Sequence, residues 1–169
     1  MDELDIVLNA GKKFGVDEAL VIYTSKIDVK DAIRYKAKFG ELHDALNWVE
    51  PGYDIQPEEM RKLLREYTKA ILVIGNDGKL QLEKFWEAMM AIEHALLINN
   101  YPRAFAMMSG PCRGCTKCTV KQGKTCADPI SRRPSLEGVG IDIVSTVKRF
   151  KKNVSWGPGF HSIGLVLLE

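Results

Sequence analysis

The chain has 169 residues, of which 46% are hydrophobic and 27% are charged, and its formal net charge is +2. This length suits one domain that buries its own core, and so small a net charge gives no reason by itself to expect nucleic acid or an anionic membrane as a partner. No apolar run approaches the roughly 18 residues of a membrane-spanning helix, and the acidic start lacks the cationic and apolar regions of a secretory signal, so we expect a cytoplasmic protein.

The first third of the chain alternates helical and extended patterns. Residues 3–14 carry their apolar side chains on one face and predict an amphipathic helix, with Gly15 as its C-cap. The apolar run at 19–23 predicts a buried strand, and we interpret residues 26–35 as a polar strand or hairpin. Residues 36–53 are harder to assign, because their helical spacing is ended by a Pro-Gly pair.

The rest of the chain alternates three helical patterns with three apolar, strand-like runs. We expect helices at residues 57–67, 82–98 and 143–150, and strands at residues 70–74, 104–108 and 163–168. The first of these helices opens with proline and two glutamates, which suit the positive end of a helix dipole. The strand at 104–108 leads directly into the segment that holds all the cysteines.

This alternation of strands with helices predicts an α/β fold, with a central mixed sheet of about four or five strands flanked by helices. We find no internal repeat, low-complexity tract or linker that would divide the chain. Residues 1–169 are therefore expected to form a single domain. The order of the strands is left open by the sequence.

The chemistry of the chain is concentrated in its cysteines. All four lie in one stretch with the spacing C-x2-C-x2-C-x7-C, at Cys112, Cys115, Cys118 and Cys126. In a reducing compartment, clustered cysteines are metal ligands more often than disulfides. Cysteines two residues apart on a tight loop also rarely reach disulfide geometry. We therefore predict one metal centre in the Cys-rich loop, residues 110–134.

Two cofactors are consistent with four cysteines in this loop. Four cysteines hold iron–sulfur clusters, and the C-x2-C-x2-C start is shared with one ferredoxin pattern, so a [4Fe–4S] cluster is our first interpretation. Structural zinc more often uses two C-x2-C pairs separated by a longer stretch. Here Cys115 would have to serve two overlapping pairs, which makes a tetrahedral site awkward. A four-cysteine zinc site nevertheless stays open as the alternative.

The residues around the cysteines are basic and rich in glycine. The cations of the loop are Arg113, Lys117, Lys121, Lys124, Arg132 and Arg133, whereas Asp128 is the only acid between residues 111 and 133. We expect these cations to lower the pKa of the thiols, to favour the reduced state of a cluster and to dock an acidic partner. Gly110, Gly114 and Gly123 are expected to adopt positive φ, so that backbone amides turn toward sulfur.

The same cations could contact phosphates, which would give nonspecific affinity for nucleic acid. No aromatic residue lies between Phe105 and Phe150, however, so the loop has no platform on which bases could stack. Charge compensation and solvation of the loop explain the cations more simply. We therefore expect no nucleic-acid partner.

One other group of residues has acid–base or hard-metal potential. His43 and Asp44 are flanked by Glu41 and Glu50. The helical spacing of their apolar neighbours favours a simpler interpretation, in which these side chains form the solvent-exposed face of a short helix. No phosphate-binding glycine loop or nucleophile motif is present. A cluster-dependent enzyme of unknown reaction that uses this region is therefore the weaker alternative.

Two motifs of the chain resemble a known family. They are Gly110-Pro-Cys-Arg-Gly-Cys-x2-Cys followed by Cys126, and Arg133-Pro-Ser-Leu-Glu-Gly-Val-Gly-Ile-Asp142. They resemble the prokaryotic family of predicted metal-binding proteins, domain of unknown function 2284, and the likeness extends from residue 19 to the closing run. The four cysteines match the family motif residue by residue. The resemblance implies a metal centre but supplies no reaction.

The chain departs from the family pattern at four positions. Members carry an upstream K-C-x3-C-x8-C-P-P-Y pattern, but here Ala37, Glu41 and Glu50 stand at its three cysteines, and Val139 stands where a further cysteine is expected. The resemblance therefore implies that a second centre, if relatives build one from these cysteines, is lost. We expect one [4Fe–4S] cluster that passes single electrons to or from a redox protein partner. The alternative is a structural zinc site in a non-redox interaction module, and the oligomeric state is left open.

Overall fold

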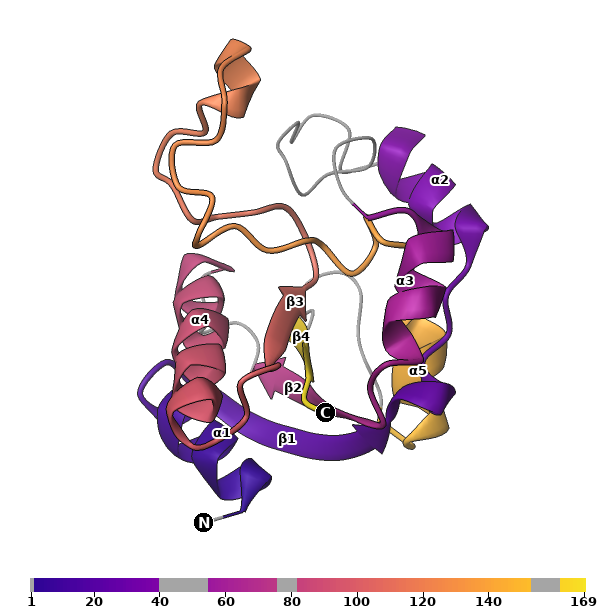
Figure 1. The fold of residues 1–169 in the computed structure, drawn as a ribbon, viewed down its shortest axis with the longest axis vertical. Coiled ribbons are helices and arrows are strands. Elements are labelled where there is room, and N and C mark those ends of the chain that lie inside the picture. The colour runs from indigo at the N-terminus through magenta and orange to yellow at the C-terminus, as the bar shows by residue number, and fades with distance from the viewer. Residues whose placement is uncertain (1, 40–54, 76–81, 153–161) are drawn as a thin grey trace.

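The structure is a computed structural model of the chain, and it describes residues 2–39, 55–75, 82–152 and 162–169. A four-stranded sheet lies at its centre (Figure 1). Its strands are β1 (Val16–Tyr23), β2 (Lys69–Gly75), β3 (Phe105–Met108) and β4 (Ser162–Leu167), and they lie in the order β1-β2-β4-β3. This sheet and its helices confirm the predicted α/β class and the strand number.

The prediction of a mixed sheet is wrong, because all three neighbouring strand pairs are antiparallel. β2 and β3 do run in the same direction and are joined through the helix α4 (Leu82–Ile98), as the alternating pattern indicated. The last strand, β4, lies between them and runs the opposite way. It therefore converts a parallel crossover into two antiparallel pairs. Strand insertion of this kind leaves no local signal in the sequence.

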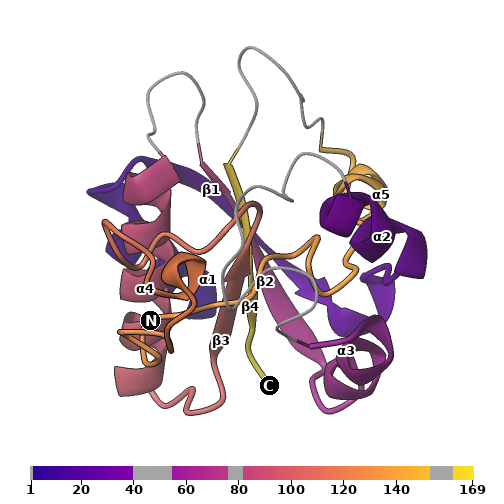
Figure 2. The same ribbon diagram turned by 90° about the horizontal axis from the view of Figure 1, so that it is seen from above.

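The helices cover both faces of the sheet (Figure 2). On one face lie α1 (Glu3–Lys12) and α4. On the other lie α2 (Asp31–Phe39), α3 (Pro57–Leu64) and α5 (Ile143–Arg149). Alternate residues of β2 accordingly enter two separate cores, with Ile71 and Val73 on the α4 side, and Leu72 and Ile74 on the α3 and α5 side. The two inner strands, β2 and β4, are buried along nearly their whole length.

The predicted helices at 82–98 and 143–150 and the strand before the cysteines are confirmed. The first helix is confirmed too, but it ends at Lys12 with Lys13 as its C-cap, so the prediction of Gly15 as the C-cap is wrong. The strand predicted at 19–23 begins earlier, at Val16. The strand or hairpin predicted at 26–35 is wrong, because the chain forms a short 3-10 helix, η1 (Thr24–Lys26), and then α2. The reason is the helical spacing of Arg34 and Ala37, which bury one face of α2.

The helical spacing within residues 40–53 lies outside the described residues. In the part of the chain that the structure does describe, no helix has both the length and the apolar character needed to cross a membrane.

Candidate metal centre

The cysteine loop leaves the sheet at the end of β3 and returns to the same place. The Ser109 N–H donates to the Ile163 carbonyl at 2.9 Å where the loop departs, and the Leu136 N–H donates to the Met108 carbonyl at 3.0 Å where it returns. Between these two bonds the loop extends well beyond the sheet. The 3-10 helix η2 (Val120–Gln122) lies at its far end, above α4 in Figure 1. The sheet therefore fixes the base of the loop.

Two of the three loop glycines adopt the backbone conformation that we predicted. Gly110 has φ +85° at the base of the loop, and Gly123 has φ +73° directly after η2. Residues with a Cβ rarely adopt this positive φ, so glycine suits both turns. The prediction is wrong for Gly114, which has no positive φ. This residue lies over the Trp86 ring of α4, since a Cβ at Gly114 would stand 3.6 Å from the ring.

The four cysteines line a single hollow. Cys112, Cys115, Cys118 and Cys126 form its wall together with Gly114, Thr119, Ala127, Asp128 and Arg132, and its volume is about 20 Å³. All four thiols are free of disulfides. Among the described residues, no three His, Cys, Asp or Glu side chains converge closely enough to hold one metal ion. The thiols therefore surround a space rather than meet at a point.

Cys112 is a partly buried cysteine that contacts the core. Its side chain packs against the core cluster beneath α4, and the backbone N–H groups of Gly114 and Arg133 lie close enough to affect the pKa of its thiol. Burial raises the pKa of the Cys112 thiol, and the two amide donors oppose that rise. The structure thus supplies this sulfur with the fixed donors that a ligating thiolate uses.

Cys115 also lines the hollow and, unlike Cys112, is exposed. Partial desolvation raises the pKa of its thiol, and the neighbouring Cys126, Asp128 and Cys118 raise it further. Our expectation that the loop cations lower the thiol pKa is therefore wrong for Cys112 and Cys115. The groups that act on these sulfurs are other thiols, a carboxylate and backbone amides, whereas two of the cations point to carboxylates of α4.

Two ion pairs join the cysteine loop to α4. Arg113 Nη1 lies 2.9 Å from Glu83 Oε1, at a site where the glutamate is 62% exposed. Arg133 and Glu93 are both only 15% exposed and form a two-pronged pair, in which Arg133 Nε lies 2.9 Å from Glu93 Oε2 and Nη2 contacts Oε1. The same Glu93 carboxylate accepts the Ala106 N–H of β3 at 2.6 Å. Glu93 therefore connects the loop, the helix and the sheet.

Sequence reasoning missed the role of Glu93, although a signal was present. Glu93 follows Trp86 by seven residues and Met89 by four, so it falls within the apolar stripe of α4. A carboxylate in such a stripe needs a buried partner. The sequence contains several arginines that could serve, and only the fold selects Arg133.

The segment after the loop inserts into the core and carries the second family motif. Leu136, Val139 and Ile141 are fully buried, and the buried Arg34 of α2 donates to the Gly138 carbonyl between them. Glu137 lies at the base of the loop, where its carboxylate accepts the Gly110 N–H at 3.2 Å. Desolvation of the carboxyl group raises the pKa of Glu137, although the residue as a whole is only partly buried.

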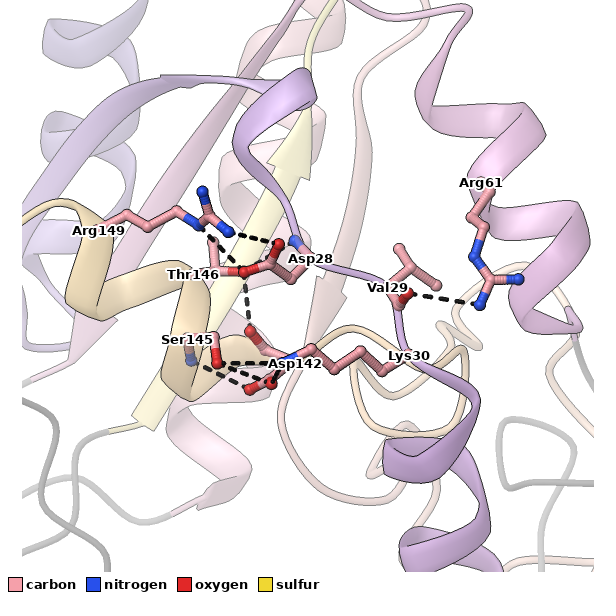
Figure 3. A network of polar contacts seen from close by, with 8 residues as sticks. All are labelled: Asp28, Val29, Lys30, Arg61, Asp142, Ser145, Thr146 and Arg149. Atoms are coloured by element: carbon pink, nitrogen blue, oxygen red, sulfur yellow. Dashed lines mark hydrogen bonds and ion pairs between the residues drawn. The ribbon is translucent and has the colours of Figure 1, made fainter.

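The motif ends in a polar network on the opposite side of the sheet from α4 (Figure 3). Asp142 is the N-cap of α5 and accepts from the Ser145 N–H at 3.0 Å. It also forms an ion pair with Lys30 at 2.6 Å. Burial acts to raise the pKa of Asp142, but the bonds from Lys30 and Ser145 hold it below its ordinary value. Beside it, Arg149 pairs with Asp28 at 2.8 Å. These contacts fix α5 and the segment that precedes α2.

Two of the positions at which relatives are expected to carry cysteine can be located. Ala37 and Val139 are both buried, with 6% and 0% exposure, and neither offers a metal-binding atom. Glu41, Glu50, His43 and Asp44 lie outside the described residues, so the weaker enzyme interpretation is left without a described site.

Comparison with known proteins gives one match. The model of the family described as "Predicted metal-binding protein (DUF2284)" matches residues 20–168, which is most of the chain. It is the same family that the cysteine motif and the Arg133–Asp142 motif resemble. No curated protein and no solved structure matches the chain.

Proposed function

We propose, from the premise that this chain belongs to the family of predicted metal-binding proteins, domain of unknown function 2284, that its cysteine loop holds one [4Fe–4S] cluster. The ligands are Cys112, Cys115, Cys118 and Cys126. The protein then serves as a carrier of single electrons to or from a protein partner. Membership of the family and the four cysteines support metal binding; the cluster and its role are our proposal.

The observation that carries the proposal is the hollow lined by all four thiols. The hollow of about 20 Å³ brings the four thiols to one site. The overlapping C-x2-C-x2-C spacing of Cys112, Cys115 and Cys118 favours a cluster over zinc there, because a tetrahedral zinc site would make Cys115 serve two overlapping pairs.

The donors around Cys112 also suit a cluster. The reduction potential of an iron–sulfur cluster depends on hydrogen bonds to the sulfurs, on net charge and on exposure. The backbone N–H groups of Gly114 and Arg133 act to lower the pKa of the Cys112 thiol against the effect of burial, and the Arg133 side chain is held by its largely buried pair with Glu93. At Cys112, the groups that oppose the cost of burying a thiolate are therefore backbone donors rather than loop cations.

A cluster bound by four thiolates supplies one electron at a time. One side of the hollow is covered by the core beneath α4, and the other is open to solvent. Cys112 packs against the α4 core and keeps water from one side, whereas Cys115 is exposed on the other. In the described part of the chain, a larger pocket of about 390 Å³ lies elsewhere, between η1 and α3, and shares no residue with this hollow.

The test starts from protein purified without oxygen. We expect a brown protein with a broad absorbance near roughly 400 nm that bleaches on addition of about one electron per chain. Cys118→Ser should lose the absorbance and the metal, whereas the matched loop variant Thr116→Ser, at an exposed position, should keep both. A colourless protein that holds one zinc per chain would refute the cluster and establish the structural-zinc alternative.

A further inference from the structure

We infer that the open side of the hollow is a docking surface for an acidic one-electron carrier protein. The surface consists of Cys115, Lys117, Lys124, Ile130 and Arg132. The inference rests on the proposed function, because it names the partner class of the same site.

The first argument is where the hollow opens. α4 covers the side of Cys112 and Gly114 through Trp86, which is only 5% exposed. Of the four cysteines, Cys115 is the one whose residue is exposed. Figure 1 shows the loop standing clear of the sheet, so that its outer part is open to an approaching protein. An electron would therefore leave or enter by the Cys115 side.

The second argument is how the loop cations are distributed. Arg113 and Arg133 are engaged by Glu83 and Glu93 of α4. Lys117 and Lys124 are exposed, and no ion pair is formed by either within the described residues. Arg132 is also exposed and lines the hollow. Lys117 and Lys124 thus leave positive charge on the exposed part of the loop, where it would attract negative charge.

The single acid of this segment does little to cancel that charge. Asp128 accepts the Ser131 N–H at 3.2 Å, and this bond together with the Ser131 side chain lowers the pKa of the carboxyl group. Asp128 is therefore held in a local turn as one negative charge among several positive ones. The net charge of the surface stays positive, which is complementary to an acidic partner.

The third argument is an exposed apolar side chain in the same Cys-rich loop. Ile130 is 83% exposed, the highest value among the large hydrophobic residues that are described as exposed. Complexes of electron carriers bury small areas, at the low end of protein interfaces. One apolar contact surrounded by cations is the arrangement expected for such a small interface, with a dehydrated centre and a polar rim.

These features favour a protein over a nucleic acid. A single-stranded nucleic acid is held by cations together with aromatic side chains on which its bases stack. The loop supplies an aliphatic isoleucine instead, and the sequence has no aromatic residue from 106 to 149. The partner therefore presents carboxylates around a small apolar spot. The step is the passage of one electron, in which one protein is oxidised as the other is reduced, and no bond forms or breaks.

The test uses flavodoxin, an acidic flavoprotein, as the probe, and the anaerobically purified protein in its reduced form. Stopped-flow absorbance measures the second-order rate of formation of the flavin semiquinone at low and at high salt. We expect the double variant Lys117→Glu/Lys124→Glu to lower the low-salt rate by about tenfold or more, and to bring the rate within about twofold of wild type at high salt. Ile130→Ser should lower the rate by about threefold or more at both salt concentrations, because apolar contact is not screened.

The matched control is Lys12→Glu/Lys26→Glu, which makes the same change of net charge on exposed residues of α1 and η1. Its rate should stay within about twofold of wild type at both salt concentrations. An equal loss of rate in the two double variants would overturn the inference. So would electron transfer to a small neutral oxidant with none to flavodoxin, or binding of a single-stranded oligonucleotide that the loop double variant abolishes.

Failure of the docking surface can be told apart from failure of the proposed function. If wild-type protein carries no iron chromophore, the proposed cluster is wrong and the docking inference falls with it. If the chromophore is present and is bleached normally by a chemical reductant in every variant, but the rate with flavodoxin ignores the loop charges, the docking surface alone is wrong.

Discussion

Removing the carboxylate of Glu93 should destabilise the protein far more than removing that of Glu83, although both pair with an arginine of the cysteine loop. Glu93→Ala leaves Arg133 without its ion-pair partner at a site that is 15% exposed, and leaves the Ala106 N–H of β3 without its 2.6 Å acceptor. Glu83→Ala removes only a pair in which the glutamate is 62% exposed.

The magnitudes follow from burial. Breaking a buried ion pair by removal of one partner costs about 3–5 kcal/mol. Arg133 retains bonds of 2.7 Å from Nη1 to the Ile130 and Arg132 carbonyls, so we expect a value near the lower end, about 3 kcal/mol. For a chain of this size that corresponds to a melting temperature lowered by roughly 6–12 °C. The exposed pair of Glu83 should contribute less than about 1 kcal/mol.

Urea unfolding followed by far-ultraviolet circular dichroism measures both changes, with a constant m-value as the condition for comparing midpoints. Glu93→Gln is the matched control, because its amide oxygen can still accept the Ala106 N–H while the charge is lost, and its cost should lie between those of the two alanine variants. A free-energy loss for Glu93→Ala no greater than that for Glu83→Ala would refute the view that this pair anchors the loop.

Three further predictions concern the fold around the site. Gly164→Ala should cost about 1–3 kcal/mol in thermal unfolding, since a Cβ there would stand 2.3 Å from Met89 Sδ across the core; an unchanged melting temperature would contradict this packing. Asp142→Asn should destabilise the protein at pH 7 through loss of the Lys30 pair. Because the folded-state pKa of Asp142 is lowered, its contribution is present above the unfolded pKa of about 3.9 and is lost as pH falls through the folded value. The gap in stability between wild type and Asp142→Asn should therefore close below about pH 4, and a gap independent of pH would argue against the ion pair. Val139→Cys should bind no additional metal on elemental analysis, since Val139 is fully buried in the core; a gain of metal would show that this position can still serve a centre.

The sequence predicted those parts of the fold in which local pattern and tertiary packing agree. The apolar run of β2 is buried on both faces of the sheet, so its burial could be read without knowing its neighbours. α4 buries a stripe of residues at helical spacing, and its 17 residues were predicted correctly. Direction within the sheet could not be predicted, because it depends on where the last strand, β4, inserts.

The error at α2 has a different cause. Ile27, Val29 and Ile33 suggest an extended segment by alternation, but Ile33 belongs to a helix that buries Arg34. A buried arginine is a weak helical signal in a sequence. The burial of Arg34 is explained only by its acceptors, the carbonyls of Ile55 and Gly138, which are distant along the chain.

The ligands of the candidate site could be predicted from the sequence, but the groups that surround their sulfurs could not. The spacing of the cysteines indicated that they would gather, and the structure places all four around one hollow. The effect of charge was misjudged, because composition counts cations without telling which of them face the sulfurs. Arg113 and Arg133 are turned toward α4 by glutamates 30 and 40 residues away in the chain, and backbone amides act on Cys112 instead.

The most direct test of the central claim is the stoichiometry of iron, acid-labile sulfide and zinc in one anaerobically purified sample. A [4Fe–4S] cluster on Cys112, Cys115, Cys118 and Cys126 predicts about four irons and about four sulfides per chain, with zinc near zero, and loss of both iron and sulfide in Cys118→Ser. One zinc per chain without sulfide, or a full cluster that survives in Cys118→Ser, would contradict it.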